Sequence, residues 1–349
     1  MTVPAIRAAF TAQAAACASL GSPFMAQLMR LCATQDWPAG AVTTRIHGWT
    51  GDLGPSGQSV PLRLAGALHA LQLQGHARLT PVYPPHSSDD AALWAAVADV
   101  LVSEQAAILR WLDSPPQTNE VRRSAVLIAL GHWLADRFAL PLRCSELGAS
   151  AGLNLQWDDY ALALGGQVFG PATPALTLSP DWTGTLPPDT RPQVTARAGV
   201  DLTPLDPHTP DDALRLRAYL WPDQPDRKAL TQAAIATART TVAKCDAIDW
   251  LAGQLDHQQG QTHLIYTTIA WQYFPAAAQD RGTAMISAAG RTAHDDAPLA
   301  WFGMEPDGAG PGAALTLRLW PGDLTFALGR ADFHGRWVHW TPDQTTKKD

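Results

Sequence analysis

The sequence predicts an α/β protein in which a helical segment precedes a mainly parallel sheet. Two observations predict this class. In the first third of the chain, apolar residues recur at steps of three and four, as on one face of a helix. From about residue 140 onward, short apolar runs alternate with helical patterns, which is typical of βαβ units. We therefore expect an N-terminal all-helical lobe over residues 1–115 and an α/β domain over residues 116–349.

The helices of the first lobe are expected where the three- and four-residue steps are clearest. They cover residues 3–19, 23–34, 60–74 and 89–112. The Pro115-Pro116 pair marks the domain boundary because proline interrupts a helix. A capped helix is expected to follow within residues 117–136, and the apolar stretch LPLRCSELG then predicts the first strand.

The second domain is expected to hold a seven-stranded sheet. The strands are predicted over residues 140–148, 193–201, 240–246, 263–271, 298–306, 314–322 and 324–340. Helices are expected over residues 150–164, 247–256 and 275–293, with one or two more in 211–239. Residues 166–192 are rich in Pro, Gly and Thr and are interpreted as an insertion too polar for the core. No helix separates the last two strands, so they predict an antiparallel hairpin.

Composition limits the partners that the chain can have. The net charge is −7, so no general attraction to nucleic acid or anionic membranes is expected. No apolar run approaches the ~18 residues of a membrane span, and the N-terminus is interpreted as an amphipathic helix rather than a signal peptide. The four cysteines include no C-x-x-C pair, so no metal site is predicted. We expect a cytoplasmic protein with no nucleic-acid or membrane partner; the sequence predicts no oligomeric state.

The stretch CSELGASAGLNL, residues 144–155, admits two interpretations. One is a strand that ends at Glu146 and a nucleotide-binding turn through Gly148 and Gly152. The other is G-x-S-x-G, which presents Ser150 as the nucleophile of a serine hydrolase. Helices rather than strands precede Ser150, and no His-Gly-Gly loop lies upstream, so the hydrolase is the less favoured alternative.

A Rossmann-like sheet explains the turn better, because the turn follows the first strand. Acidic residues should then end the next two strands and contact the ligand. Asp201 ends the second predicted strand, and Asp246 ends the third. A nicotinamide site would require G-x-G-x-x-G, which the turn does not match.

Three stretches resemble the S-adenosylmethionine-binding motifs of class I methyltransferases: ELGASAG at 146–152, GVDLTP at 199–204 and KCDA at 244–247. The resemblance implies a methyltransferase-type seven-stranded sheet and S-adenosylmethionine as cofactor. It implies cofactor contacts from Glu146, Gly148, Ser150 and Gly152 at the methionine end, from Asp201 at the ribose, and from Asp246 and Ala247 at the adenine.

The chain departs from that pattern in three ways. Ser150 replaces the middle glycine of the turn, 49 positions separate Gly152 from Asp201, and the helix expected between the fifth and sixth strands is missing. Over most of residues 1–340, the chain also resembles a bacterial family of proteins of unknown function. The stretches that carry this resemblance are VPLRLAGALHAL, ELGASAGLNL, AGVDLTPLD, the WPDQ…R segment, TTIAWQYFP and HGRWVHW.

Candidate residues for an acceptor site follow the fourth strand. Trp271 or Tyr273 is expected to stack on an acceptor and Gln272 to hydrogen-bond it; equally, Trp271 and Phe274 are core residues and Tyr273 caps the sheet. Further candidates are the proton acceptors Glu305 and His334, and the cofactor-covering residues Asn119, Glu120 and Arg123, each with a structural alternative. The segment 221–224 is either a turn anchored by its tryptophan or part of the acceptor rim.

We therefore expect an S-adenosylmethionine-binding protein, and most simply a methyltransferase. An acidic chain without a basic stripe favours a small-molecule acceptor over a polyanion. The alternative is a Rossmann-like module that binds a ligand without catalysis.

Overall fold

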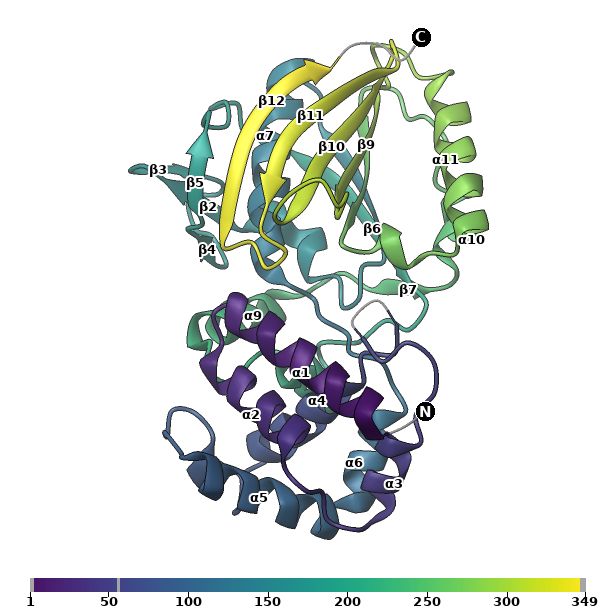
Figure 1. Ribbon diagram of the computed structural model, residues 1–349. Helices are drawn as coiled ribbons and strands as arrows, with labels where there is room; N and C mark the ends of the chain where they lie inside the picture. Colours follow the sequence, from purple (N-terminus) through teal and green to yellow (C-terminus); the bar gives the residue numbers. More distant parts are fainter. Residues whose placement is uncertain (1–2, 55–56, 346–349) are drawn as a thin grey trace. The chain divides into compact units, whose positions relative to one another are not determined.

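The computed structural model describes residues 3–54 and 57–345, which form two compact units (Figure 1). The first unit comprises Met1–Thr118 and Thr209–Ala229, and the second comprises Asn119–His208 and Leu230–Asp349. The chain thus leaves the second unit after His208. It returns within helix α9 (Pro225–Thr237).

Helices joined by loops, and no strands, make up the described residues of the first unit. Its helices are α1 (Val3–Ser19), α2 (Pro23–Thr34), α3 (Ala41–His47), α4 (Val60–Leu73), η1 (Thr80–Val82), α5 (Asp90–Ser103), α6 (Gln105–Leu112) and α8 (Pro210–Ala218), with the start of α9. The helices predicted over 3–19 and 23–34 are confirmed. The helix predicted over 89–112 is two helices, because Glu104 has a non-helical backbone between them.

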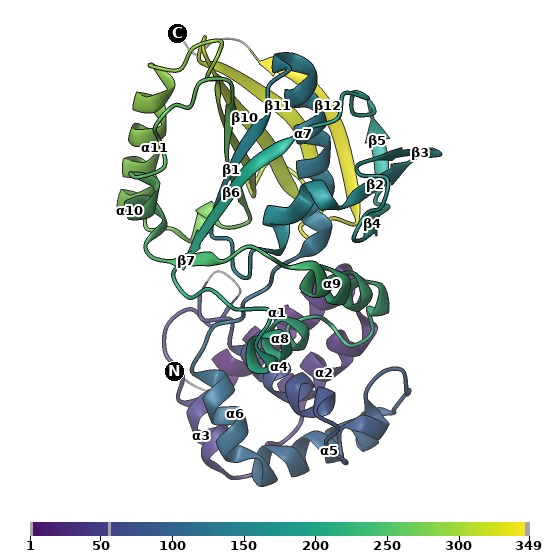
Figure 2. The same cartoon turned by 180° about the vertical axis from the view of Figure 1, so that it is seen from behind.

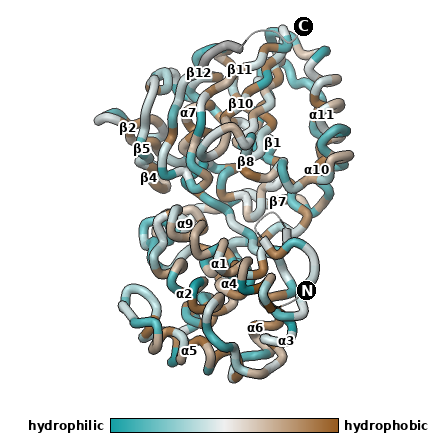
Figure 3. Tube along the Cα trace, viewed as in Figure 1, coloured by the Kyte–Doolittle hydropathy of each residue, from teal (hydrophilic) through white to brown (hydrophobic). Residues whose placement is uncertain are grey.

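The buried faces of these helices form one hydrophobic core. Residues Ile6, Phe10 and Cys17 of α1 lie on the same face and are buried in it. Hydrophobic and hydrophilic stretches alternate along the helices of this unit (Figure 3). No single helix in the described ranges is long and apolar enough to cross a membrane. Helices α5 and α6 reach that length only together, and they are bent by 89°.

The segment 221–224 is a turn anchored by its tryptophan. Trp221 is buried in the core of the first unit. Asp223 accepts hydrogen bonds from Ser22 Oγ at 2.5 Å and from the Phe24 backbone N–H at 2.9 Å. These contacts explain why a segment distant in sequence folds with the N-terminal helices.

The second unit is built on a nine-stranded mixed sheet. Five of its strands are parallel neighbours: β7 (Val242–Lys244), β6 (Val194–Asp201), β1 (Leu142–Leu147), β8 (Thr262–Thr268) and β9 (Leu299–Glu305), in that spatial order. If these five strands are numbered by their order along the chain, their order across the sheet is 3-2-1-4-5, as in a doubly wound sheet. The direction of winding reverses between β1 and β8.

The rest of the sheet accounts for the difference between seven predicted strands and nine observed ones. Antiparallel strands β10 (Ala313–Trp320), β11 (Leu324–Ala331) and β12 (Trp337–Thr345) follow β9. The single strand predicted over 324–340 is therefore two strands, joined by a turn at residues 332–336. Strand β5 (Asp181–Gly184) adds a ninth strand beside β12.

Helices cover both faces of this sheet (Figure 2). Helix α7 (Ser124–Phe138) lies on one face, where Trp133 contacts the Phe326 ring of β11. Helices α10 (Ala247–Leu251) and α11 (Ala276–Gly290) lie on the other, where Leu147 is buried among their apolar residues. Side chains alternate along a strand, so Glu146 lies on the face opposite to that of Leu147.

The helix predicted over 150–164 is wrong. The chain there forms a 3₁₀ segment, η3 (Leu153–Asp159), and then strand β2 (Ala161–Leu164). Residues 153–157 are all buried, and Gln156 has a non-helical backbone. The Leu153 N–H donates to Asn119 Oδ1 and its carbonyl accepts from the Tyr160 hydroxyl, so distant and side-chain partners replace helical hydrogen bonds.

Residues 166–192 are mostly exposed or half-buried, as predicted, but the segment also forms strands and buries a few apolar side chains, which the sequence did not predict. Strands β3 (Gln167–Phe169) and β4 (Thr177–Leu178) form a small sheet with β2, and β5 joins the main sheet. Phe169, Leu176 and Leu178 are buried. These apolar residues and the strand pairing attach the segment to the rest of the second unit.

Candidate functional site

The carboxyl ends of the parallel strands meet at one edge of the sheet, and we call this the carboxyl edge. In doubly wound sheets, ligands bind at this edge where the winding reverses, which here is between β1 and β8. The segments at the edge are the turn at 148–152, the residues after Asp201, the loops after β7, β8 and β9, and the turn at 332–336.

The glycine turn after β1 is tightly packed. Gly148, Ser150 and Gly152 all have positive φ angles, of 78°, 54° and 72°. A Cβ on Gly148 would stand 2.6 Å from the Ala270 methyl, and one on Gly152 would stand 2.9 Å from Val242 Cγ2. Both glycines are therefore required by the backbone conformation and by neighbouring strands, before any ligand is considered.

The backbone N–H groups of the turn donate within the protein. Gly148 and Ala149 both donate to the Val200 carbonyl, and Gly152 donates to that of Ala149. Ser150 donates to Asp201 Oδ2 at 2.9 Å. A phosphate-binding loop instead directs its N–H groups at the ligand. The turn therefore suits a ligand that has no phosphate.

Asp201, at the end of β6, closes the turn from the neighbouring strand. Its Oδ2 accepts the Ser150 N–H, and its Oδ1 accepts the Thr203 N–H at 2.9 Å. A carboxylate offers about four acceptor positions. Asp201 therefore keeps acceptor capacity for ligand hydroxyls while it holds the turn.

Asp246 follows β7 and caps helix α10. Its Oδ1 accepts the N–H groups of Ile248 and Asp249, at 2.9 and 3.0 Å, and Arg281 approaches to 3.5 Å. Ala247 is buried against the hydrophobic core on that face of the sheet. The Cys245 N–H donates to the Asp201 carbonyl at 3.1 Å, so the segments after β6 and β7 lie side by side.

Glu146 is the buried acid of the site. Only 1% of its surface is exposed, and its Oε2 has no hydrogen-bond partner among the residues that the structure describes. Burial raises its pKa well above the ordinary value and the negative charge of Asp201 raises it further, while the Arg123 guanidinium and a hydrogen bond with the Tyr266 side chain act in the opposite direction. Glu146 is in register with Gly199 on the neighbouring parallel strand, two residues before Asp201, so the Glu146 and Asp201 side chains point to the same face of the sheet.

The predicted acceptor residues lie on a 3₁₀ turn, η4 (Trp271–Tyr273). Trp271 packs against Phe274 and Trp301, with ring centroids 5.4 Å apart in both pairs. Tyr273 is 59% exposed, and Gln272 is exposed as well. The structure thus gives Trp271 a core position and leaves Gln272 and Tyr273 accessible.

Glu305, at the end of β9, holds the start of this 3₁₀ turn. Its Oε1 accepts the N–H groups of Ala270 and Trp271, both at 3.0 Å. Ala270 in turn contacts Gly148. Burial raises the pKa of the Glu305 carboxyl, and the hydrogen bonds from Ala270 and Trp271 oppose that change.

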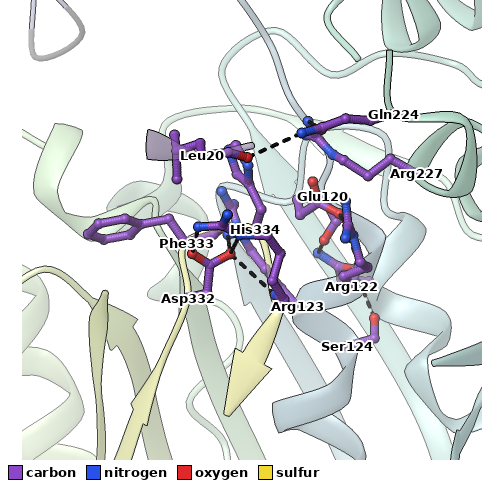
Figure 4. A network of polar contacts seen from close by, with 12 residues as sticks. Leu20, Glu120, Arg122, Arg123, Ser124, Gln224, Arg227, Asp332, Phe333 and His334 are labelled. Atoms are coloured by element: carbon purple, nitrogen blue, oxygen red, sulfur yellow. Dashed lines mark hydrogen bonds and ion pairs between the residues drawn. The ribbon is translucent and has the colours of Figure 1, made fainter. Parts of the chain in front are cut away.

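The segment before α7 contributes to the same edge. The Arg123 guanidinium, on η2 (Val121–Arg123), lies beside Phe333 (Figure 4) and donates to its carbonyl at 2.9 Å. It also donates to the Thr268 carbonyl, at 3.0 Å. His334 lies in the same β11–β12 turn and donates its backbone N–H to Asp332. Asn119 holds Leu153, so it supports the chain that follows the glycine turn.

An open pocket of about 210 Å³ lies beside the glycine turn. It is lined by Pro204–His208 after β6 and by Arg239–Val242 before β7. Ligand pockets typically enclose roughly 300–1,000 Å³. This space therefore accommodates part of a ligand rather than a whole cofactor.

Sequence reasoning missed a serine–histidine pair on the opposite face of the sheet. Ser145 Oγ lies 2.8 Å from His263 Nε2, and Arg143 Nη2 lies 3.0 Å from His263 Nδ1. A guanidinium only donates, so Nδ1 accepts and the ring proton is on Nε2. The imidazole thus donates to Ser145 and does not act as its base. The Ser150 hydroxyl, in contrast, is buried without a hydrogen-bond partner in the described part of the chain.

The fold and the site define an α/β protein with a doubly wound core of five parallel strands and acidic residues at its carboxyl edge. The chain belongs to the family described as uncharacterized proteins conserved in bacteria (DUF2332), whose model matches residues 7–340. No curated protein and no solved structure matches the chain. The described residues contain no group of three or more His, Cys, Asp or Glu placed to hold a metal ion.

Proposed function

We propose that the protein binds S-adenosylmethionine at the carboxyl edge and transfers its methyl group to a small-molecule acceptor. The observation that carries this proposal is the hydrogen bond from the Ser150 N–H to Asp201, which joins the glycine turn to the acid of the next strand. The order of the five parallel strands supports it, because that order brings both motifs to the point where the winding reverses.

The inward-directed N–H groups of the turn favour this cofactor over a dinucleotide. S-adenosylmethionine carries no phosphate, so it requires no ring of backbone donors. Glu146 and the turn would hold its methionine part, Asp201 its ribose, and Asp246 with Ala247 its adenine. The bound cofactor would supply an activated methyl group. The protein then has to hold the acceptor in line with that group and exclude water from it.

Residues of this chain are available for those tasks. Gln272 and Tyr273 are accessible at the end of β8 and suit contact with an acceptor. Glu305 holds the turn that carries them. The net charge of −7 favours a neutral or cationic small molecule over a polyanion.

Calorimetric titration with S-adenosylmethionine and S-adenosylhomocysteine tests the proposal. We expect micromolar binding, about −8 kcal/mol. Asp201→Ala and Asp246→Ala should each weaken it at least about tenfold, roughly 1.4 kcal/mol. Asp323→Asn is the matched control, since Asp323 lies in the β10–β11 turn at the opposite edge and pairs with Arg318. A folded wild-type protein that binds neither compound would refute the proposal.

A further inference from the structure

Glu146 occupies an unusual position for a carboxyl group. It lies one residue before the end of β1, it is almost fully buried, and its Oε2 lacks a hydrogen-bond partner among the described residues. A buried, ionised carboxylate without such a partner is strongly destabilising. The environment therefore has to supply either a proton or a compensating positive charge.

The groups that face Glu146 come from every element packed against it. They are Asp201 from β6, Tyr266 from β8, Arg123 from η2, Cys144 from β1 and Tyr160 after η3. Burial raises the pKa values of Cys144, Tyr160 and Tyr266, so these three remain neutral. A hydrogen bond between the Tyr266 side chain and Glu146 opposes the rise in the Glu146 pKa without reversing it, and the Tyr266 hydroxyl also donates to the Asn154 carbonyl, at 3.3 Å.

The charged groups near Glu146 are thus one carboxylate and one guanidinium. The Arg123 guanidinium binds two backbone carbonyls, and the Asp201 carboxylate binds two backbone N–H groups. If Glu146 were also ionised, two negative charges would stand against one positive charge, and the Glu146 charge would be fully buried whereas Asp201 and Arg123 are half-buried. A proton on Glu146 balances the cluster in the free protein.

We propose that the protein exchanges the Glu146 proton for the positive charge of its ligand. In this exchange the protonated carboxyl gives its proton to solvent, and the carboxylate that remains pairs with a cationic group of the ligand at the carboxyl edge. A cation within about 4–6 Å lowers the pKa of a carboxyl by roughly 1–3 units, which is enough to drive the exchange. This inference rests on the proposed function, since S-adenosylmethionine carries an ammonium and a sulfonium group.

The exchange makes affinity depend on pH. Where Glu146 is protonated in the free protein and ionised in the complex, each unit of pH raises the affinity by up to about tenfold. A proton is released to the buffer for each ligand bound. S-adenosylhomocysteine also carries an ammonium group, so it should release a proton as well.

Titration calorimetry at pH 7 in buffers of different ionisation enthalpy measures this proton directly. For the wild-type protein, we expect the heat of binding of either compound to change with the buffer, with a slope approaching one proton released. Glu146→Gln should bind with no buffer dependence. Glu146→Asp, which restores a carboxyl, should release the proton again and guards against a variant that fails to fold.

Glu305→Gln is the matched control, because Glu305 is a second buried carboxyl with a raised pKa at the same edge. It should retain the proton release. Wild-type binding without buffer dependence would overturn the inference, as would release that persists in Glu146→Gln or disappears only in Glu305→Gln. Absence of binding in every buffer would instead refute the proposed function, and the inference with it.

Discussion

The Asp201 carboxylate accepts the Ser150 backbone N–H at 2.9 Å, although 51 residues separate the two positions. The Leu205 N–H donates to the Ser150 carbonyl at 3.4 Å. The end of β6 and the segment after it thus bind both the backbone N–H and the backbone carbonyl of Ser150. Ser150 is kept in the left-handed region by these contacts, with φ at 54°. The turn is therefore shaped before any ligand arrives.

Replacing Ser150 with glycine should not destabilise the protein. A non-glycine residue in the left-handed region costs about 1–2 kcal/mol, and glycine removes that cost while losing roughly 0.5–1 kcal/mol in chain entropy. The Ser150 hydroxyl makes no hydrogen bond in the described structure, so its loss removes no partner. Urea unfolding should show Ser150→Gly equal to the wild type or more stable by up to about 1.5 kcal/mol.

The neighbouring Ala149→Gly is the control for this prediction. Ala149 is buried and its φ is not positive, so glycine there should cost about 1 kcal/mol. The cofactor proposal further expects Ser150→Gly to bind S-adenosylmethionine. If a fluorophosphonate probe labelled the wild-type protein and not this variant, the hydrolase interpretation would be favoured instead.

Gly131→Ala should destabilise the second unit, against the helix propensity of alanine. Gly131 lies in α7, where alanine is normally better by about 1 kcal/mol. A Cβ there would stand 2.2 Å from Trp157 Cη2, and overpacking costs about 1–3 kcal/mol. Gly253→Ala is the control, since its nearest neighbour, the Trp250 carbonyl oxygen, is 3.7 Å away. Equal urea midpoints for both variants would contradict the packing of α7 on η3.

Glu305→Gln should stabilise the protein increasingly as pH rises. Burial raises the pKa of Glu305 above its ordinary value of 4.5, so the folded state binds its proton more tightly than the unfolded state does. The folded state therefore loses stability as pH rises from about 4.5 to the raised pKa of the folded protein, by at most about 1.4 kcal/mol per unit, and loses no more above it. Glutamine keeps an acceptor for Ala270 and Trp271 without titrating. Urea unfolding at pH 5 and pH 8 should show that the variant exceeds the wild type in free energy of unfolding by more at pH 8. An equal difference at both pH values would contradict a raised pKa of Glu305.

His263 should have the opposite effect on pH stability. Burial, assisted by the charge of Arg143, lowers the pKa of His263 to about 3 from its ordinary value of 6.5. The unfolded state binds the proton more readily, so stability is lost as pH falls from 6.5 toward 3. His263→Gln should show a shallower loss of stability than the wild type between pH 7 and pH 5. Parallel urea midpoints across that range would show that the histidine titrates normally.

The sequence predicted the elements that local patterns determine. Helices α1 and α2 were placed correctly because their apolar spacing is local, and proline at the start of α2 marks its first turn. The helix predicted over 150–164 was wrong because two side chains take the backbone hydrogen bonds of Leu153. Asn119, from outside the segment, accepts from its N–H, and the Tyr160 hydroxyl donates to its carbonyl. No sequence spacing reveals such partners.

The candidate site likewise contains one contact that the sequence predicts and one that it does not. Glu146 and Asp201 come together because both end parallel neighbouring strands, and strand ends are visible in the sequence. The contact between Ser145 and His263 depends on the register of β1 against β8, across 118 residues. A sequence gives the side-chain alternation of each strand, but it does not give that register.

Tyr273→Ala should impair methyl transfer without affecting stability. Tyr273 is 59% exposed at the end of β8, so its removal should change the free energy of unfolding by less than about 0.5 kcal/mol and leave cofactor binding intact. If the ring stacks on the acceptor, its loss should raise the KM for that acceptor. Trp271→Ala should instead cost about 1–3 kcal/mol of stability, because Trp271 packs against Phe274 and Trp301. The measurement is transfer of label from S-adenosylmethionine to fractionated metabolites, with Val168→Ala, another exposed apolar residue, as the control. Label on added RNA alone, with a steep dependence on salt, would show that the acceptor is not a small molecule.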